Sequence, residues 1–88
     1  GCDLRLAVFA DCILSDATFF DADLRSADLS GADLTRACFQ TARLEGADLS
    51  NAIISETDMR ATYDKNTKWP EGYDPQDNGA VLIDDEAS

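Results

Sequence analysis

Carboxylates are the commonest side chains in this chain that could do chemistry. The 88 residues include 18 Asp and Glu, 7 Lys and Arg, and no His. Two carboxylates held across a cleft can act as the acid and base of a glycosidase. Candidate pairs are Asp21 with Asp23 and Asp28 with Asp48, and a further acidic run is Asp84-Asp85-Glu86. Without His, the chain lacks the commonest general base and the usual partner of a Ser or Cys nucleophile.

Ligands for metals or cofactors are equally sparse. The three cysteines, Cys2, Cys12 and Cys38, have neither zinc-finger spacing nor a His partner, so we expect reduced thiols and no zinc site. Asp74-x-Gln76-x-Asn78-Gly79 resembles part of an EF-hand loop, but Pro70 and Pro75 exclude the entry helix that such a loop needs. No glycine-rich phosphate loop occurs. We predict no cofactor-binding and no metal-binding residues.

The elements that must position these side chains follow from a five-residue repeat. A large apolar residue returns at every fifth position, and a small residue stands two positions before it. The large residues are Leu4, Phe9, Leu14, Phe19, Leu24, Leu29, Leu34, Phe39, Leu44, Leu49, Ile54 and Met59. The small ones are Cys2, Ala7, Cys12, Ala17, Ala22, Ala27, Ala32, Ala37, Ala42, Ala47, Ala52 and Thr57. A repeat that runs through most of a sequence predicts a solenoid.

A period of five fits neither an α-helix nor a straight strand. Five residues rotate an α-helix by about 140°, which spreads the apolar residues around the cylinder. In a strand, an odd step moves each side chain to the opposite face. The large residues share one interior only if the chain bends once in each repeat. Matches twenty residues apart, such as Asp3 with Asp23 and Phe19 with Phe39, favour four repeats per coil.

The runs Ala22-Asp23-Leu24, Ala27-Asp28-Leu29, Ala32-Asp33-Leu34 and Ala47-Asp48-Leu49 resemble the A-(D/N)-L-x-x unit of pentapeptide repeat proteins. The resemblance implies an all-β, right-handed quadrilateral β-helix, and members mostly without a known biochemical activity. Residues 63–75, which contain Thr67-Lys68-Trp69-Pro70, are similar to a tail that follows the repeats in many cyanobacterial members. We predict a β-helix of about three coils over residues 1–60 and a mostly irregular capping tail over 61–88.

The outer surface and the tail allow further expectations. Charged columns such as Asp16, Arg36 and Glu56 would run along the coil. Outward apolar residues cluster early, so we expect the N-terminal coil to meet either upstream repeats or a second copy. These residues are Leu6, Val8, Ile13 and Phe20, with Ile53 further along. The five-residue register ends after Met59, and we expect Trp69 and at least one Tyr to cover Met59 and Ile54.

Function follows from what such a rod can do. Carboxylates on the outside of a filled coil face no cleft, so we predict no enzyme activity and no catalytic residues. The net charge of −11 argues against direct nucleic-acid binding, and no apolar run is long enough to span a membrane. We expect a structural, protein-interaction module within a longer chain. The alternative is a DNA mimic that binds a topoisomerase. A cytoplasmic location is expected, or the periplasm or thylakoid lumen if a targeting segment lies upstream.

Overall fold

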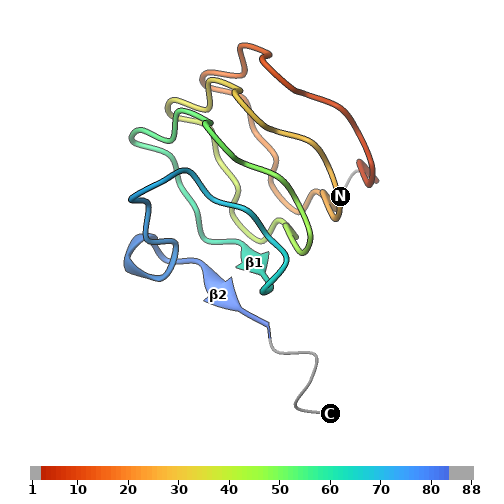
Figure 1. Ribbon diagram of the computed structural model, residues 1–88, viewed down its shortest axis with the longest axis vertical. Coiled ribbons are helices and arrows are strands. Elements are labelled where there is room, and N and C mark those ends of the chain that lie inside the picture. Colours follow the sequence, from red (N-terminus) through yellow and green to blue (C-terminus); the bar gives the residue numbers. More distant parts are fainter. Residues whose placement is uncertain (1–2, 84–88) are drawn as a thin grey trace.

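The computed structural model describes residues 3–83, which form a stack of short bent segments (Figure 1). Each segment lies parallel to the one twenty residues further along: Val8 pairs with Asp28, and Asp28 pairs in turn with Asp48. Four repeats separate paired residues, so the coil has four sides, as the sequence predicts. The outward residues of these sides are Asp3, Asp23 and Arg43; Val8, Asp28 and Asp48; Ile13, Asp33 and Ile53; and Thr18, Cys38 and Asp58.

A hydrogen-bonded turn forms the corners of the coil from Leu4–Ala7 to Leu49–Ala52. In the first of these turns the Ala7 N–H donates to the Leu4 carbonyl at 3.0 Å, and the same bond recurs in later repeats. The corner residue has positive φ, for example 64° at Leu6 and 60° at Arg36. A type II turn requires positive φ at its third residue. The period of five predicts one bend per repeat. The structure forms this bend with a residue of positive φ at every fifth position.

Large and small inward residues fill the interior together. The wholly buried large side chains are Leu24, Leu29, Leu34, Phe39, Leu44, Leu49 and Met59, and the Ala residues of the same repeats are also buried. Burying one such large side chain contributes about 1.5–3 kcal/mol of transfer free energy. Phe rings stack along the axis, with 4.9 Å between the centroids of Phe19 and Phe39. The inward assignment made from the repeat is thus confirmed for these coils.

The first coil is less well buried. Leu4, Phe9 and Leu14 are only partly buried against the core. Cys12 is a free thiol and is exposed, although its place in the repeat predicts a packed inward residue. The reason is that Cys12 has a coil on one side only among the residues that the structure describes. Cys2 lies outside the described residues.

The coil continues beyond residue 60 with a shift of register. Thr62 pairs with Arg43, one residue short of the usual offset, and Lys68 pairs with Asp48 at the usual offset. The five-residue register does break after Met59, but Tyr63, and not Asp64, takes the next inward position and is buried. The boundary between residues 60 and 61 stays a prediction, and pairing runs across it.

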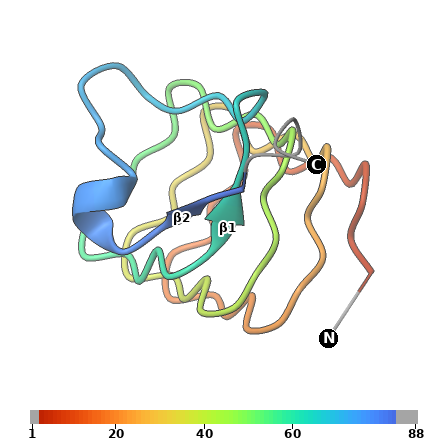
Figure 2. The same cartoon turned by 90° about the horizontal axis from the view of Figure 1, so that it is seen from below.

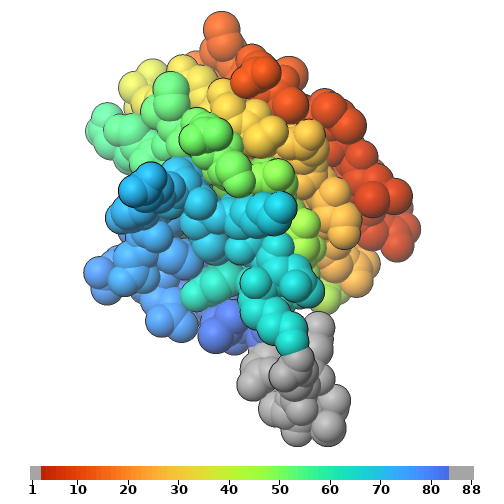
Figure 3. All heavy atoms as spheres, viewed as in Figure 1, coloured from red at the N-terminus to blue at the C-terminus, as the bar shows by residue number. Residues whose placement is uncertain are grey.

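The last described residues add a short sheet and a single helical turn. β1 (Thr62–Tyr63) pairs in parallel with β2 (Val81–Leu82), and the 3-10 helix η1 (Gln76–Asn78) lies between them in sequence. Seen from below, η1 and β2 lie on the near side of the coils (Figure 2). The N-terminal coil and residues 70–83 therefore occupy opposite ends of the molecule, as the space-filling view also shows (Figure 3).

Candidate interaction surfaces

The outward aspartates bind their own backbone. Asp33 Oδ1 accepts the N–H of Thr35 at 3.1 Å and the Thr35 hydroxyl at 2.6 Å. Asp28 makes the same two bonds to Ser30, at 3.0 and 2.6 Å. The second bond lowers the pKa of Asp33, because a donor to a carboxylate favours its charged form. These carboxylates support the corner that follows each of them.

Among the described residues, the carboxylate pairs that the sequence offers for acid–base chemistry do not face each other, and the run Asp84-Asp85-Glu86 lies outside the described residues. Asp28 and Asp48 lie side by side on successive coils, and Asp48 accepts the Ser50 N–H at 2.9 Å. Asp21 accepts a hydrogen bond from the Thr41 hydroxyl, and Asp23 is paired with Arg25. All four side chains project outward. None of these pairs could therefore hold a substrate between its two carboxyl groups.

Arginines two residues after an aspartate form ion pairs that the sequence analysis missed. Arg25 Nε donates to Asp23 Oδ1 at 2.8 Å, and Arg25 Nη2 donates to Asp23 Oδ2 at 2.6 Å. Arg5 binds Asp3 in the same way and holds the pKa of that carboxyl at about 2. The Asp-x-Arg spacing was the available signal, since residues two apart in an extended segment share a face.

The predicted charged columns form in part. Arg36 Nε lies 2.9 Å from Asp16 Oδ1 of the preceding coil, as predicted. Glu56, at the other end of that column, makes no ion pair with Arg36 in the described part of the chain. Such exposed pairs contribute at most about 1 kcal/mol each.

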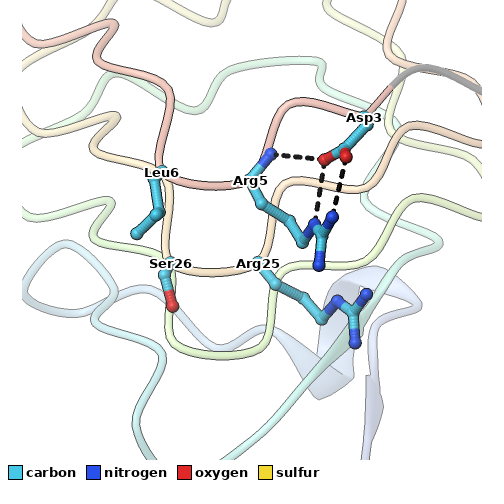
Figure 4. Close-up of a pocket in the computed structure, with 5 residues that line it drawn as sticks. All are labelled: Asp3, Arg5, Leu6, Arg25 and Ser26. Atoms are coloured by element: carbon cyan, nitrogen blue, oxygen red, sulfur yellow. Dashed lines mark hydrogen bonds and ion pairs between the residues drawn. The ribbon is translucent and has the colours of Figure 1, made fainter.

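One side of the coil carries a shallow depression lined by Asp3, Arg5, Leu6, Arg25 and Ser26 (Figure 4). In this view the Arg5 and Arg25 side chains extend in the same direction from successive coils. This side balances Arg5, Arg25 and Arg43 against Asp3, Asp23 and Glu45, so the negative charge of residues 3–60 is carried by the other three sides. A site for a strongly charged ligand is not indicated here.

Exposed apolar residues gather on the first coil, as predicted. Leu6, Val8 and Ile13 are 74%, 72% and 80% exposed, and we call these three residues the first-coil apolar surface. Phe20 and Ile53 are also exposed, at 55% and 53%. Most outward positions of the later coils carry charged or hydroxyl side chains, so this surface differs in chemistry from the rest of the coil.

The backbone of the first coil has an unpaired edge. Phe9 N–H donates to Asp28 O at 2.6 Å, and Asp28 N–H donates to Ala7 O at 2.8 Å. The backbone groups of Ala7 and Phe9 are therefore used in pairing with the second coil, and the groups of the residues between them point to the opposite edge of the first coil. Within residues 3–83, the N–H and carbonyl groups of Val8, Ile13 and Thr18 make no backbone hydrogen bond. An exposed row of donors and acceptors of this kind can accept a further strand.

The C-terminal residues form an aromatic cluster. Trp69 packs edge to face on Tyr63 at 5.4 Å between centroids and stacks on Tyr73 at 5.4 Å. Trp69 Nε1 and the Tyr73 hydroxyl are buried and have no hydrogen-bond partner within the described residues. Burial raises the pKa of Tyr73 to about 12.

The EF-hand-like run contains η1 and the residues on either side of it. Asp74 Oδ1 accepts the Gln76 N–H at 3.0 Å, and the Asn78 side chain donates to the Asp74 carbonyl at 2.8 Å. In the part of the chain that the structure describes, no three His, Cys, Asp or Glu side chains gather as metal ligands would. A membrane-spanning helix is likewise missing from residues 3–83.

Comparison with known proteins identifies the repeat. A family model described as pentapeptide repeats matches residues 2–40 and 27–63, with 8 copies. Members form right-handed quadrilateral β-helices, which agrees with the four-sided coil. A search of curated proteins found no match.

Two solved structures from the cyanobacterium Nostoc are similar to this chain. HetL, a pentapeptide repeat protein involved in heterocyst differentiation regulation, is 27% identical with a TM-score of 0.67. The match covers 90% of this chain and 35% of HetL, so this chain spans about a third of that protein's length. The pentapeptide repeat protein alr5209 is 27% identical with a TM-score of 0.45, and the match covers 92% of this chain and 84% of that one. This chain belongs to the pentapeptide repeat family.

Proposed function

We propose that the chain is a non-catalytic structural module that binds another protein through the first-coil apolar surface. The observation that carries this proposal is the exposure of Leu6, Val8 and Ile13 on a coil whose other outward positions are mostly polar. Apolar residues grouped on a surface of this kind are typical of protein-interaction sites. The interior is filled by side chains, and the outward aspartates are hydrogen-bonded to the backbone, so neither favours a catalytic site. HetL, involved in heterocyst differentiation regulation, is a relative whose described role also names no reaction.

The test is site-specific photo-crosslinking in the source cells. A photoreactive side chain at position 8 is expected to capture a protein other than this chain, whereas one at position 48, on the same side of the coil, captures much less. The captured protein must then bind the purified chain, and Val8→Ser with Ile13→Ser must weaken that binding at least tenfold. Equal capture from positions 8 and 48 would contradict the proposed surface.

We further propose that the repeats build about three coils and that residues 61–83 cap their C-terminal end. Support comes from the complete burial of Met59 and from the Tyr63–Trp69–Tyr73 ring contacts. Pairing of β2 with β1 adds a further layer at the same end. A cap of this kind is needed because the end of a solenoid otherwise exposes its interior and an unpaired edge.

DNA mimicry is the alternative that the sequence left open, and the arrangement of charge does not favour it. A duplex carries regular negative charge, about one per 1.7 Å of axis. Here one side is balanced between Arg and carboxylates, and Arg36 pairs with Asp16 on a corner. A gyrase supercoiling assay with the purified chain tests this alternative. No change in supercoiling is expected.

A further inference from the structure

We propose that one side of the coil binds an amphipathic helix of a partner protein through a column of outward residues, Ile13, Asp33 and Ile53. The bound helix would present an apolar, a basic and a second apolar side chain on one face. This inference rests on the proposed interaction function and states the chemistry of the partner. The column lies on the side of the coil stack, so a neighbouring coil lengthens the column and does not cover it.

The three residues occupy the same outward position of successive coils. Ile13 pairs with Asp33, and Asp33 pairs with Ile53, in parallel register. Ile13 is 80% exposed and Ile53 is 53% exposed. The corresponding columns of the other sides hold at most one large apolar side chain each; they are Asp3, Asp23 and Arg43; Val8, Asp28 and Asp48; and Thr18, Cys38 and Asp58. A large apolar residue that returns at an exposed site of the same side forms a surface, which isolated exposed residues do not.

Asp33 supplies a carboxylate between the two apolar side chains. Both hydrogen bonds that it accepts from Thr35 go to Oδ1, at 3.1 and 2.6 Å, so Oδ2 has no hydrogen bond among the described residues. The Thr35 hydroxyl lowers the pKa of Asp33, so the carboxylate is charged at neutral pH. The corner therefore fixes the carboxyl group of Asp33 and leaves one of its oxygens for a cation of the partner.

The corners on either side of the column are also acidic. Asp11 lies at one corner, and Asp16, Arg36 and Glu56 lie at the other. Arg36 pairs with Asp16, whereas Asp11 and Glu56 form no ion pair within residues 3–83. Opposite charges across an interface favour the correct partner, and like charges exclude the wrong one. A basic helix therefore fits this side of the coil and an acidic helix does not.

The spacing of the column matches one face of an α-helix. Neighbouring strands lie about 4.8 Å apart, so Ile13 and Ile53 are separated by about 10 Å. Helical residues seven positions apart are separated by about 10.5 Å along the axis, and a residue between them lies on the same face. Three residues on one face of an extended strand span about 13 Å. A helix that lies along the coil stack therefore aligns with all three residues of the column, and an extended segment does not.

Short side chains beside the column allow a helix to approach. Two positions after the column residues stand Ser15, Thr35 and Ser55. Residues two apart in an extended segment share a face, so these hydroxyl side chains lie on the same side of the coil. None of them is long enough to keep a helix away from Ile13 or Ile53.

Selection from a displayed library of helical peptides tests the proposal, with the purified 88-residue chain as the target. The library is an Ala-rich helix of about 20 residues in which only three positions of one face, spaced i, i+4 and i+7, are randomised. We expect apolar residues at the two outer positions and Arg or Lys at the middle one. Selected peptides with another order, or no enrichment over the starting library, would overturn the proposal.

Substitution of an apolar residue locates the bound peptide. Ile53→Ser should weaken binding of a selected peptide by about tenfold, and Ile13→Ser should act in the same direction. Phe20→Ser is the matched control, because Phe20 is 55% exposed on another side of the coil. Binding that falls equally in the Ile53 and Phe20 variants would show that the peptide does not use the column.

Removal of one charge tests the role of Asp33. Asp33→Asn keeps an oxygen for Thr35, so the fold is retained while the preference for Arg over Gln at the middle position of the peptide should disappear. Asp28→Asn is the matched control, since Asp28 bonds Ser30 in the same way on the neighbouring side, and this variant should keep the preference. Equal effects of the two substitutions would assign binding to the general acidity of the chain and overturn the proposal.

The selection and the crosslinking experiment can fail separately. Capture of a protein from position 8 together with a failed selection would reject the helix chemistry and retain the first-coil apolar surface. A successful selection without capture from position 8 would reject that surface and retain the column of Ile13, Asp33 and Ile53.

Discussion

At the scale of single residues, the acidic composition of the repeat has a structural cause. The aspartates that follow the small residue hold the backbone N–H two positions later, as Asp28, Asp33 and Asp48 do. Asp and Asn are favoured in such turns because their short side chains reach that N–H. Much of the negative charge of residues 3–60 is thus a consequence of building corners and is not by itself a sign of a basic partner.

Substitution at Asp33 measures this contribution. Asp33→Ala leaves the Thr35 N–H and hydroxyl without their acceptor, and we expect the free energy of unfolding to fall by about 1 kcal/mol. Asp33→Asn retains a side-chain oxygen in the same place and should lose less than half of that amount. Urea unfolding followed by circular dichroism gives both values. Equal losses for Ala and Asn would show that the hydrogen bond is not the cause.

Acid should destabilise the fold through the carboxylates that pair with arginine. Bonds to arginine lower the pKa of Asp3 to about 2 and lower the pKa values of Asp16 and Asp23 below the ordinary 3.8. A depressed pKa means that the unfolded state takes up protons first as the pH falls. The stabilisation is therefore complete above about pH 4 and is lost as the pH falls toward 2. Thermal melting at constant ionic strength measures this, and a melting temperature that stays level from pH 5 to pH 2 would contradict it.

High pH should destabilise the fold through ionisation of Tyr73. Burial raises its pKa from 10.0 to about 12, so the folded state resists loss of the phenol proton. The corresponding stability is complete below pH 10 and is lost as the pH rises toward 12. Tyr73→Phe removes the titrating group and should flatten the melting temperature over this range. A variant that declines with pH as steeply as the unchanged chain would assign the effect to another residue.

At the scale of the repeat element, the corner determines whether the chain can turn. Gly46 has a φ of 74°, and a Cβ there would lie 3.3 Å from Ser26 Oγ. Other corners hold residues with side chains in the same conformation, such as Asn51 at 63°. The corner position therefore tolerates a side chain at a cost that depends on its shape.

Two substitutions at Gly46 test that dependence. Gly46→Val should lower the free energy of unfolding by about 1–2 kcal/mol, because a β-branched residue is strained at positive φ. Gly46→Asn should lower it by well under 1 kcal/mol, since Asn adopts this conformation more readily. Chemical denaturation of the two variants side by side makes the comparison. Val and Asn variants of equal stability would contradict a conformational cause.

Inward and outward positions of one side of the coil should differ sharply in sensitivity. Leu34 is wholly buried, and Leu34→Ala should cost about 2–5 kcal/mol because it leaves a cavity. Ile53 lies on the same side of the coil but is 53% exposed, and Ile53→Ala should change stability by at most about 0.5 kcal/mol. Denaturant titration of both variants is the measurement. Comparable losses would contradict the inward assignment of the repeat.

At the scale of the whole molecule, the two ends of the coil are unlike. Trp69 is partly buried between Tyr63 and Tyr73, whereas the first coil carries the first-coil apolar surface and an unpaired edge. The proposed cap and the proposed interaction surface therefore lie at opposite ends of the described residues.

Trp69 reports on the C-terminal end because it is the chain's single tryptophan. Its fluorescence should be blue-shifted and poorly quenched by iodide, since the ring is partly buried and contacts two aromatic neighbours. Trp69→Ala should destabilise the chain by about 2 kcal/mol or more. Glu71→Ala, an exposed position nearby, is the control and should have little effect. A solvated emission spectrum would contradict the proposed cap.

The sequence by itself determined the coil, because every repeat places the same residue types at the same positions. A bend per repeat, four repeats per coil and the inward positions of Leu24, Leu34 and Phe39 all follow from that local regularity. The exposed first-coil apolar surface was also predictable, because outward positions are defined by the same register.

Tertiary structure decided what happens where the regularity stops or where a side chain has a choice of partners. Tyr63 occupies an inward site only because one residue is skipped and pairing with the coil before it continues. Cys12 has an inward position but is exposed, because burial depends on a neighbouring coil and not on residue type. Asp23 and Asp33 both accept the backbone N–H two positions later, and each adds a side-chain bond that depends on the residue there, to Arg25 or to the Thr35 hydroxyl. A repeat pattern specifies local geometry, whereas burial and pairing depend on which coils and side chains meet in space.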